Sequence, residues 1–370
     1  MMSWEIIYLL CWIVTAILST ALVRLCIAIA PRLGYVDIPQ HEAHKNHRKS
    51  TPVMGGAGML FSWQIVITAG LVAASRFLAM ASVSDDASFI HDVAEVLKGM
   101  PSVSKNLTII GGMATFVTML GMRDDRKAMK ALPKFIGQAV AAIITVACGL
   151  RISFLHQIPL ANEIVTVLWI MGLMNAMNFF DNMDGLAGGA SVIAAFFMLF
   201  VASLRGQYFV ATLAAVTGGA ATGFLVWNAP PARLFMGDGG SHFLGYLLAV
   251  LGIMTTFYLP SESPTPAPIL IPLLILGIPL ADAVAVVIIR LRLGVPIYKG
   301  DNRHISHRFV KLGLTRPQAV LAVLLMCTIL GIAGVTLLWL PLIGTFLVMG
   351  LVAALFGLIS IIQFYVTEIK

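Results

Sequence analysis

Charged residues are scarce in this chain of 370 residues, of which only 11% are Asp, Glu, Lys or Arg. Soluble globular domains carry about 25% charged residues, so the composition argues against a soluble fold. The cysteines are also few and stand singly in apolar runs, at Cys11, Cys26, Cys148 and Cys327. Without a CxxC spacing they indicate neither a disulfide framework nor a zinc site. No basic segment precedes the first apolar run, so a cleavable signal peptide is not expected.

Long hydrophobic runs, in contrast, are abundant, and 59% of the residues are hydrophobic. A membrane-spanning helix needs about 20 apolar residues. We predict an all-α polytopic membrane protein with a single domain over residues 1–370 and about eleven transmembrane helices. The expected spans are 4–30, 53–74, 106–122, 135–150, 163–180, 187–204, 208–227, 241–259, 268–289, 317–338 and 342–366. A strand barrel is disfavoured because the runs are continuous and do not alternate in short segments.

Positive charge is concentrated in every second loop. Eleven spans place five loops on the same side, at 31–52, 123–134, 178–188, 228–241 and 290–316. These loops contain seventeen Lys and Arg residues, against five in the loops of the opposite side. The positive-inside rule therefore makes the first group cytoplasmic, with the N-terminus outside and the C-terminus in the cytoplasm. The alternative for the scattered basic residues is that they only set the topology.

The same five loops also hold carboxylates, and the densest example is the stretch NAMNFFDNMDGLAGG, residues 175–189. Ionisable groups at a membrane edge are costly unless they face water, a metal or a partner. Asn178, Asp181 and Asp184 follow an i, i+3, i+6 spacing, which would bring them near one face of a helix. We interpret the stretch as part of a site, with a structural hydrogen-bonded turn as the alternative.

Two further groups of carboxylates fit metal or proton chemistry. Asp124 and Asp125 end the third span, and such a pair can hold a divalent metal or share a proton so that one acts as a base. A helix-terminal charge cluster is the alternative. Asp238 stands among glycines at the start of the eighth span, where it could hold Mg²⁺ near a phosphate or serve as a helix N-cap. His242, one turn later, is expected to pack in the core.

The basic loops suggest an anionic ligand. His304 and His307 are spaced i, i+3 beside Arg303 and Arg308. On a short helix they would form a cationic face suited to a diphosphate, whereas a zinc site lacks a third ligand. The first loop, with His47 among its basic residues, precedes a helix start and is a candidate anion site. Asp282 lies inside the ninth span, and both a catalytic role and a hydrogen bond between helices stay open for it.

These motifs, in this order on one side of the membrane, resemble the polyprenyl-phosphate N-acetylhexosamine-1-phosphate transferases. The resemblance extends over residues 34–315 and rests on KNHRKSTPVMGG, the Asp pair with KFIGQ, NAMNFFDNMDGLAGG, NAPPARLFMGDGGSHFLG and DNRHISHRFVKLGLT. The family includes undecaprenyl-phosphate GlcNAc-1-phosphate transferases and the phospho-MurNAc-pentapeptide translocase. The translocase carries three consecutive histidines, whereas the run His304-Ile-Ser-His307 resembles the GlcNAc branch or relatives that act on a modified UDP-HexNAc.

The resemblance implies a reaction at the cytoplasmic face of the bacterial cytoplasmic membrane. A UDP-N-acetylhexosamine, with GlcNAc as the expected sugar, and undecaprenyl phosphate would give undecaprenyl-diphospho-sugar and UMP. Mg²⁺ is the implied cofactor, with Mn²⁺ as a substitute. Such a step would initiate a cell-envelope glycan, for example cell wall polymer or the O-antigen of lipopolysaccharide. Homodimer formation stays open, and no nucleic acid partner is expected.

The resemblance also implies residue roles. The catalytic carboxylates would be Asp124, which would deprotonate the lipid phosphate, Asp125 and Asp181. The metal ligands would be Asp238, Asp125 and Asp181. The substrate would contact Asn178, Asp184, Asn228, Phe235, His304, His307, Arg303, Arg308, Lys134 and His47, with Asp184, Asn228 and Phe235 near the uridine.

A different class of protein, an ion-coupled secondary transporter, is the main alternative to an enzyme. Transporters place ionisable groups near the bilayer midplane, often in repeated halves. Here the carboxylates gather in the loops of one side and no internal repeat is found, so only Asp282 favours a transporter.

Overall fold

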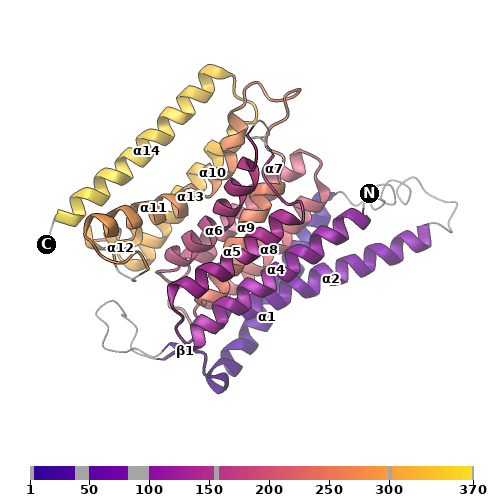
Figure 1. The fold of residues 1–370 in the computed structure, drawn as a ribbon, viewed down its shortest axis with the longest axis horizontal. Helices are drawn as coiled ribbons and strands as arrows, with labels where there is room; N and C mark the ends of the chain where they lie inside the picture. The colour runs from indigo at the N-terminus through magenta and orange to yellow at the C-terminus, as the bar shows by residue number, and fades with distance from the viewer. Residues whose placement is uncertain (1–3, 38–49, 82–99, 154–157, 299–301, 369–370) are drawn as a thin grey trace.

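Helices fill most of the chain in the computed structural model, which describes residues 4–37, 50–81, 100–153, 158–298 and 302–368 (Figure 1). They are α1 (Trp4–Leu33), α2 (Gly55–Ala81), α4 (Met100–Arg126), α5 (Ala131–Ala147), α6 (Ala161–Phe180), α7 (Leu186–Leu204), α8 (Tyr208–Asn228), α9 (Gly237–Met254), α10 (Ile271–Ile275), α11 (Gly277–Arg292), α12 (Ile305–Lys311), α13 (Arg316–Thr336) and α14 (Leu342–Glu368). A 3-10 turn, η1 (Ala267–Leu270), leads into α10. Two short strands, β1 (Val36–Asp37) and β2 (Thr51–Pro52), pair antiparallel.

The predicted spans all coincide with helices, although one of them is broken. Within the described residues, eight helices are long and apolar enough to cross a membrane, or nine if a bent pair counts as one span. That pair, Ala267–Ile275 and Gly277–Arg292, bends by 71° within the predicted span 268–289. The helix α5 is shorter, and α9 opens with the polar sequence GDGGSH. The chain is therefore an all-α multi-pass membrane protein, while the count of eleven spans and the orientation of the termini stay predictions.

The centre of the bundle is formed by α8 and α9. Every residue of α9 from Gly239 to Leu251 is buried, and α9 packs against α4 and α6, while α8 packs against α1 and α7. Small residues permit these contacts, as is usual where helices pack in a membrane. A Cβ added at Gly219 of α8, for example, would lie 2.4 Å from the carbonyl oxygen of Trp12 in α1.

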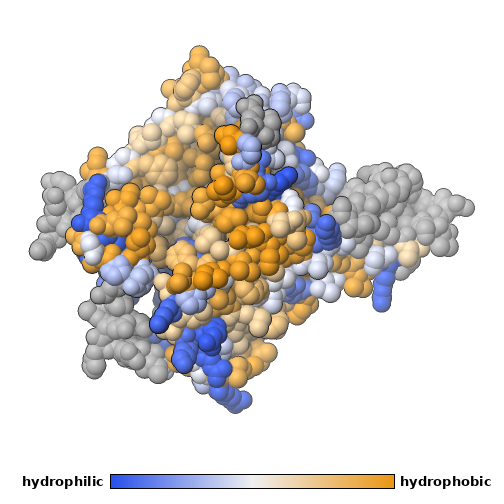
Figure 2. All heavy atoms as spheres, in the orientation of Figure 1, coloured by the Kyte–Doolittle hydropathy of each residue, from blue (hydrophilic) through white to orange (hydrophobic). Residues whose placement is uncertain are grey.

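The outer surface of the bundle is hydrophobic. Figure 2 shows hydrophobic residues over much of the face drawn, and large apolar side chains such as Ile17 of α1 and Ile343 and Leu351 of α14 are exposed. Soluble monomers rarely expose apolar surface on this scale. Lipid is the solvent that suits this surface.

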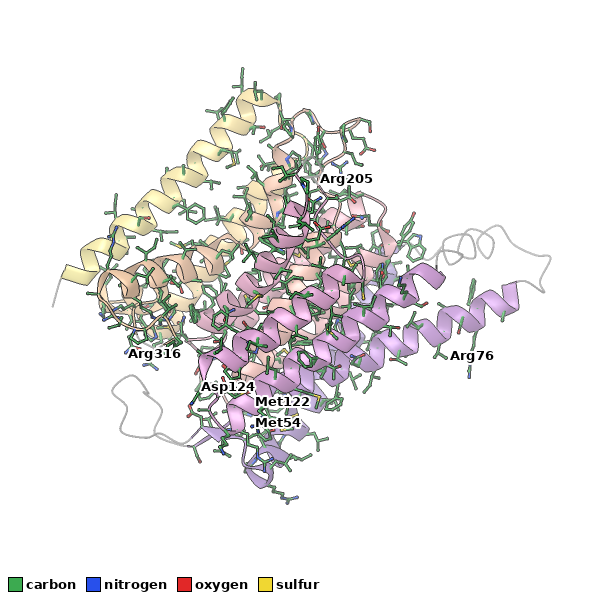
Figure 3. All side chains as sticks on the ribbon, viewed as in Figure 1. Met54, Arg76, Met122, Asp124, Arg205 and Arg316 are labelled. Atoms are coloured by element: carbon green, nitrogen blue, oxygen red, sulfur yellow. The ribbon has the colours of Figure 1, made fainter. Side chains whose placement is uncertain are left out.

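Polar connections gather at one end of the bundle. Figure 3 shows Asp124 and Arg316 at this end and Arg76 and Arg205 toward the opposite end. The connection between α1 and α2 joins the connection between α8 and α9 here, because the amide of Phe235 donates to Pro52 O at 2.9 Å and the amide of Gly55 donates to Phe235 O at 3.2 Å. Loops that lie far apart in the sequence therefore meet in one place, as the alternation of spans predicted.

Candidate active site

A cleft of about 1010 Å³ opens where these connections meet. The predicted site residues that line it are Asp125, Asn178, Asp181, Asp184, Asn228, Phe235, Asp238, His304 and His307. The first predicted loop contributes Asp37 and Thr51, at its two described ends. His47 lies outside the described residues. All five predicted loops thus reach a single cleft.

Asp238, in the first turn of α9, connects three helices at the base of the cleft. Its Oδ1 accepts a hydrogen bond from Nδ2 of Asn178 in α6 at 2.6 Å, and its Oδ2 forms an ion pair with Lys134 of α5. The Lys134 Nζ also lies 3.0 Å from Oδ2 of Asp124 in α4. Lys134 and Asp124 do not line the cleft themselves and reach it through Asp238.

The N-cap interpretation of Asp238 is wrong, because Met236 occupies the N-cap position of α9. The side chain that satisfies the start of this helix belongs to Asp125. Its Oδ1 accepts the amide of Asp238 at 2.7 Å and its Oδ2 accepts the amide of Gly239 at 3.1 Å. A carboxylate at a helix N-terminus satisfies orphan donors and complements the helix dipole. Asp125 therefore ties the end of α4 to the start of α9.

The stretch 175–189 does not form the continuous helix that its spacing suggested. The helix α6 ends at Phe180, α7 begins at Leu186, and Gly185 between them has a φ of 78°. Asp184, in this turn, accepts the amide of Ala232 at 3.0 Å. Asn228 accepts the amide of Gly185 and donates to Leu234 O, both at 2.9 Å. The turn is thus hydrogen-bonded, and it still brings its carboxylates to the cleft.

Asp181 differs from its neighbours because no hydrogen bond to its carboxylate occurs within the described residues. Burial, together with the negative charges of Asp238 and Asp184, raises its pKa to about 7. Desolvation and like charges both disfavour an ionised carboxyl group. A proton or a cation would relieve this repulsion.

The predicted loop 290–316 presents only part of its predicted cationic face to the cleft. His304 and His307 line the cleft, whereas Arg303 and Arg308 do not. The Nε of Arg308, in the short helix α12, donates to the carbonyl oxygen of Arg303 at 2.8 Å, just before that helix begins. Adjacent helical residues point about 100° apart, so His307 and Arg308 cannot share one face. Contact of these two arginines with the substrate therefore stays a prediction, since neither lines the cleft.

Positive charge at the cleft comes from two other arginines of the same loop, which the sequence did not single out as site residues. Arg290 and Arg316, the first and last residues of the predicted loop 290–316, both line the cleft. The buried Arg290 guanidinium lies 5.1 Å from the centre of the Phe179 ring. Burial, followed by the electrostatic influence of His304 and Arg316, lowers the pKa of His307 to about 4. His307 is therefore neutral at pH 7, and the fixed positive charge here comes from arginine.

The turn between α6 and α7 is also in direct contact with α12. The Oδ1 of Asn182 accepts a hydrogen bond from the Ser306 hydroxyl at 2.5 Å. Both residues belong to predicted motifs, but their contact could not be read from the sequence. It joins the turn that follows α6 to α12.

A second polar layer lies one helical turn deeper and comes from the same three helices. Its members are three or four positions away from Lys134, Asn178 and Asp238 in the sequence, namely Gln138, Asn175 and His242. The Nδ2 of Asn175 donates to Gln138 Oε1 at 2.8 Å, and Gln138 Nε2 lies 2.9 Å from His242 Nε2. His242 is fully buried, which agrees with its predicted place in the core.

Replacement of His242 by leucine should destabilise the protein. The Gln138 amide would lose an acceptor in a buried position, which costs about 1–3 kcal/mol. Unfolding of the purified protein in detergent measures the effect. His242→Gln is the matched control, since its side-chain oxygen can accept the same hydrogen bond. Equal stability of the two variants would contradict the assigned contact.

The predicted metal ligands share the cleft but do not form one coordination sphere. Within the described residues, no group of three or more His, Cys, Asp or Glu side chains is arranged to hold a metal ion. The oxygens of Asp125 already accept two amides, and those of Asp238 contact Lys134 and Asn178. The carboxylates are nevertheless the oxygen donors that Mg²⁺ prefers. Asp181, without a protein hydrogen bond, is the best placed to accept such an ion.

Comparison with known proteins identifies the family. Residues 107–256, from α4 to just beyond α9, match the family described as glycosyl transferase family 4. The chain is 32% identical over 364 residues to the probable undecaprenyl-phosphate N-acetylglucosaminyl 1-phosphate transferase of Bacillus subtilis (strain 168), covering 94% of this chain and 91% of that protein. It is 30% identical over 329 residues to the decaprenyl-phosphate N-acetylglucosaminephosphotransferase of Mycobacterium tuberculosis (strain ATCC 25618 / H37Rv), covering 80% and 74%.

A more distant likeness is to a transferase named for a different sugar. The phospho-N-acetylmuramoyl-pentapeptide-transferase of Staphylococcus carnosus (strain TM300) is 28% identical over 258 residues, covering 65% of this chain and 74% of that protein. The two relatives named for N-acetylglucosamine match over a longer part of this chain. The chain therefore belongs to the polyprenyl-phosphate N-acetylhexosamine-1-phosphate transferase family.

Proposed function

We propose that the protein transfers an N-acetylhexosamine-1-phosphate, with GlcNAc as the favoured sugar, from its UDP derivative to undecaprenyl phosphate. The products are undecaprenyl-diphospho-sugar and UMP. The observation that carries this proposal is the cleft of about 1010 Å³, whose carboxylates face histidines and arginines at the polar end of an apolar bundle. Such a cleft fits a water-soluble diphosphate, while the surrounding hydrophobic surface fits a lipid acceptor. The names of the relatives support the same two substrates.

The arrangement of charges supports phosphoryl transfer. This chemistry depends on positioning and charge neutralisation more than on a specialised nucleophile. Arg290, Arg316 and His304 are the groups suited to the diphosphate, because guanidinium binds phosphate oxygens in a bidentate manner. Asp184, Asn228 and Phe235 also line the cleft, and we assign them to the uridine.

Asp124 is proposed to take the proton of the lipid phosphate. In the described structure it reaches the cleft only through Lys134, which also pairs with Asp238. The phosphate of the lipid acceptor would be a third anionic partner for Lys134, beside Asp124 and Asp238. Movement of the ammonium toward that phosphate would uncover the Asp124 carboxylate for proton transfer. Asp125, with both oxygens on the backbone of α9, is assigned to positioning.

Mg²⁺, with Mn²⁺ as a substitute, is proposed to bind at Asp238 and Asp181, beside Asp125. The repulsion between Asp181 and its carboxylate neighbours supports a cation here. When bound, the ion would neutralise phosphate oxygens as a Lewis acid. The uneven distribution of Lys and Arg between the two sets of loops supports a cleft on the cytoplasmic side of the bacterial inner membrane. The product would then begin a cell-envelope glycan such as a cell wall polymer or O-antigen.

One assay tests the proposed reaction and its sugar. Purified protein is given undecaprenyl phosphate and, in turn, UDP-linked GlcNAc, GalNAc, QuiNAc, FucNAc or MurNAc-pentapeptide. We expect a lipid-linked product and UMP with GlcNAc, and loss of both when EDTA removes divalent cations. Transfer only from the pentapeptide substrate would assign the protein to the translocase branch. No transfer from any of these sugars would overturn the proposal.

A further inference from the structure

Asp282 is a buried carboxylate that the proposed reaction does not use. It lies in α11, five positions after the break at Gly277, and only 2% of its surface is exposed. Its Oδ2 lies 2.7 Å from Nδ1 of His304, and its Oδ1 accepts the amide of Ile305 at 2.7 Å. Both carboxylate oxygens therefore contact the start of α12, and Asp282 joins α11 to the helix that carries the cleft histidines.

The contact with His304 determines where the proton of the imidazole ring lies. An ionised carboxylate can only accept hydrogen bonds, so Nδ1 of His304 must carry a hydrogen. The other ring nitrogen, Nε2, is then the one left for a ligand. His304 is only 4% exposed, yet it lines the cleft. The Phe179 ring, with its centre 6.4 Å away in an edge-to-face arrangement, limits rotation of the imidazole.

We propose that Asp282 is a positioning residue for the transferase reaction, and this inference rests on the proposed function. Asp282 holds Nδ1–H of His304 toward α11 and so presents Nε2 to the diphosphate of the nucleotide sugar. When Nε2 takes a proton from solvent, the resulting Nε2–H donates to a phosphate oxygen and Asp282 stabilises the imidazolium. Asp282 itself touches no substrate. A carboxylate behind a functional histidine commonly sets the tautomer in this way.

Asp282→Asn separates positioning from simple packing. Asparagine has the same size, and its oxygen can still accept the Ile305 amide, so α12 keeps its start. Its NH₂ group, however, donates to Nδ1 of His304, which must then give up its hydrogen. The proton moves to Nε2, and the imidazolium loses its counter-ion. We expect kcat to fall by about 10²-fold or more, with little change in KM for the UDP-sugar because the charge on the leaving phosphate grows in the transition state.

The tautomer itself can be measured without any turnover. Nitrogen-15 NMR of imidazole-labelled protein, assigned with His304→Gln, should show His304 protonated at Nδ1 in the wild type and the neutral Nε2–H form in Asp282→Asn. Asp282→Glu, which keeps the charge and an acceptor, should restore Nδ1–H and part of kcat. A wild-type His304 in the neutral Nε2–H form would overturn the proposal, even if the variants did not fold.

The outcomes also separate this inference from the proposed reaction. If Asp282→Asn inverts the tautomer but keeps wild-type kcat, the contact is only structural and the positioning role is wrong. If the apparent kcat falls only in proportion to the loss of folded protein and KM is unchanged, with full activity per folded molecule, the positioning role is equally wrong. Absence of transfer by wild-type protein would overturn the proposed function, while the NMR spectra would still test the Asp282–His304 pair.

Discussion

Asp238→Asn is expected to reduce kcat by about 10³-fold or more in the transfer assay while the protein still folds. Asparagine preserves the size of the side chain and can still accept a hydrogen bond from Lys134. The negative charge, however, is lost at the point where α5, α6 and α9 meet. A bound cation would lose an anionic ligand, and Lys134 would be left with Asp124 as its anionic partner. Initial rates of UMP release, measured at saturating substrates, give kcat directly.

The control for this substitution lies at the other end of the bundle. Glu262 is exposed and pairs with Arg205 on the side opposite the cleft. Glu262→Gln removes one negative charge, as Asp238→Asn does, but should leave kcat unchanged. Full activity of Asp238→Asn would refute the assigned site. Parallel loss of activity in both variants would instead indicate a general effect of charge on the folded protein.

The helices could be predicted from the sequence because bilayer thickness dictates the length of each apolar run. The span expected at 208–227, for example, is the helix Tyr208–Asn228. The span expected at 268–289 is broken, since α10 ends at Ile275 and α11 begins at Gly277. Pro279 explains the position of this break. A proline within a helix clashes with the carbonyl four residues earlier, which here belongs to Ile275. A reading of hydropathy alone misses that signal.

The carboxylates of the cleft were predictable for a similar reason, because alternation of spans places their loops at one membrane face. The hydrogen-bond partner of each carboxylate oxygen was not predictable. Asp125 resembled a metal ligand in the sequence, but its oxygens accept the amides of Asp238 and Gly239 in the first turn of α9. That contact depends on how closely α4 approaches α9. The position of Arg303 and Arg308 away from the cleft was not predictable either, because the orientation of α12 depends on where it begins, at Ile305, which the sequence pattern left undefined.

The close approach of α4 to α9 depends on Gly121, and Gly121→Ala is expected to damage both stability and activity. A Cβ at this position would lie 2.4 Å from the carbonyl carbon and oxygen of Asp238 and from the amide nitrogen of Gly239. Backbone atoms cannot rotate away as a flexible side chain does, so α9 must shift. Overpacking of this kind costs about 1–3 kcal/mol. Asp125, one turn later in α4, would lose its alignment with the two amides that it accepts.

The same shift would move Asp238, because the added methyl group would clash with the backbone of Asp238 itself. Misplacement of a reacting group by about 1 Å can cost about 10²-fold in rate, so we expect a fall in kcat of that size together with a lower unfolding temperature. Gly112→Ala is the matched control: it lies in the same helix, and its Cβ would meet no atom within 4 Å. Alanine is the better helix former by about 1 kcal/mol, so this variant should be at least as stable as the wild type and fully active. If Gly121→Ala behaved like Gly112→Ala, then the contact between α4 and α9 would not be what positions Asp238, and the carboxylate would have to be held by Lys134 and Asn178 alone.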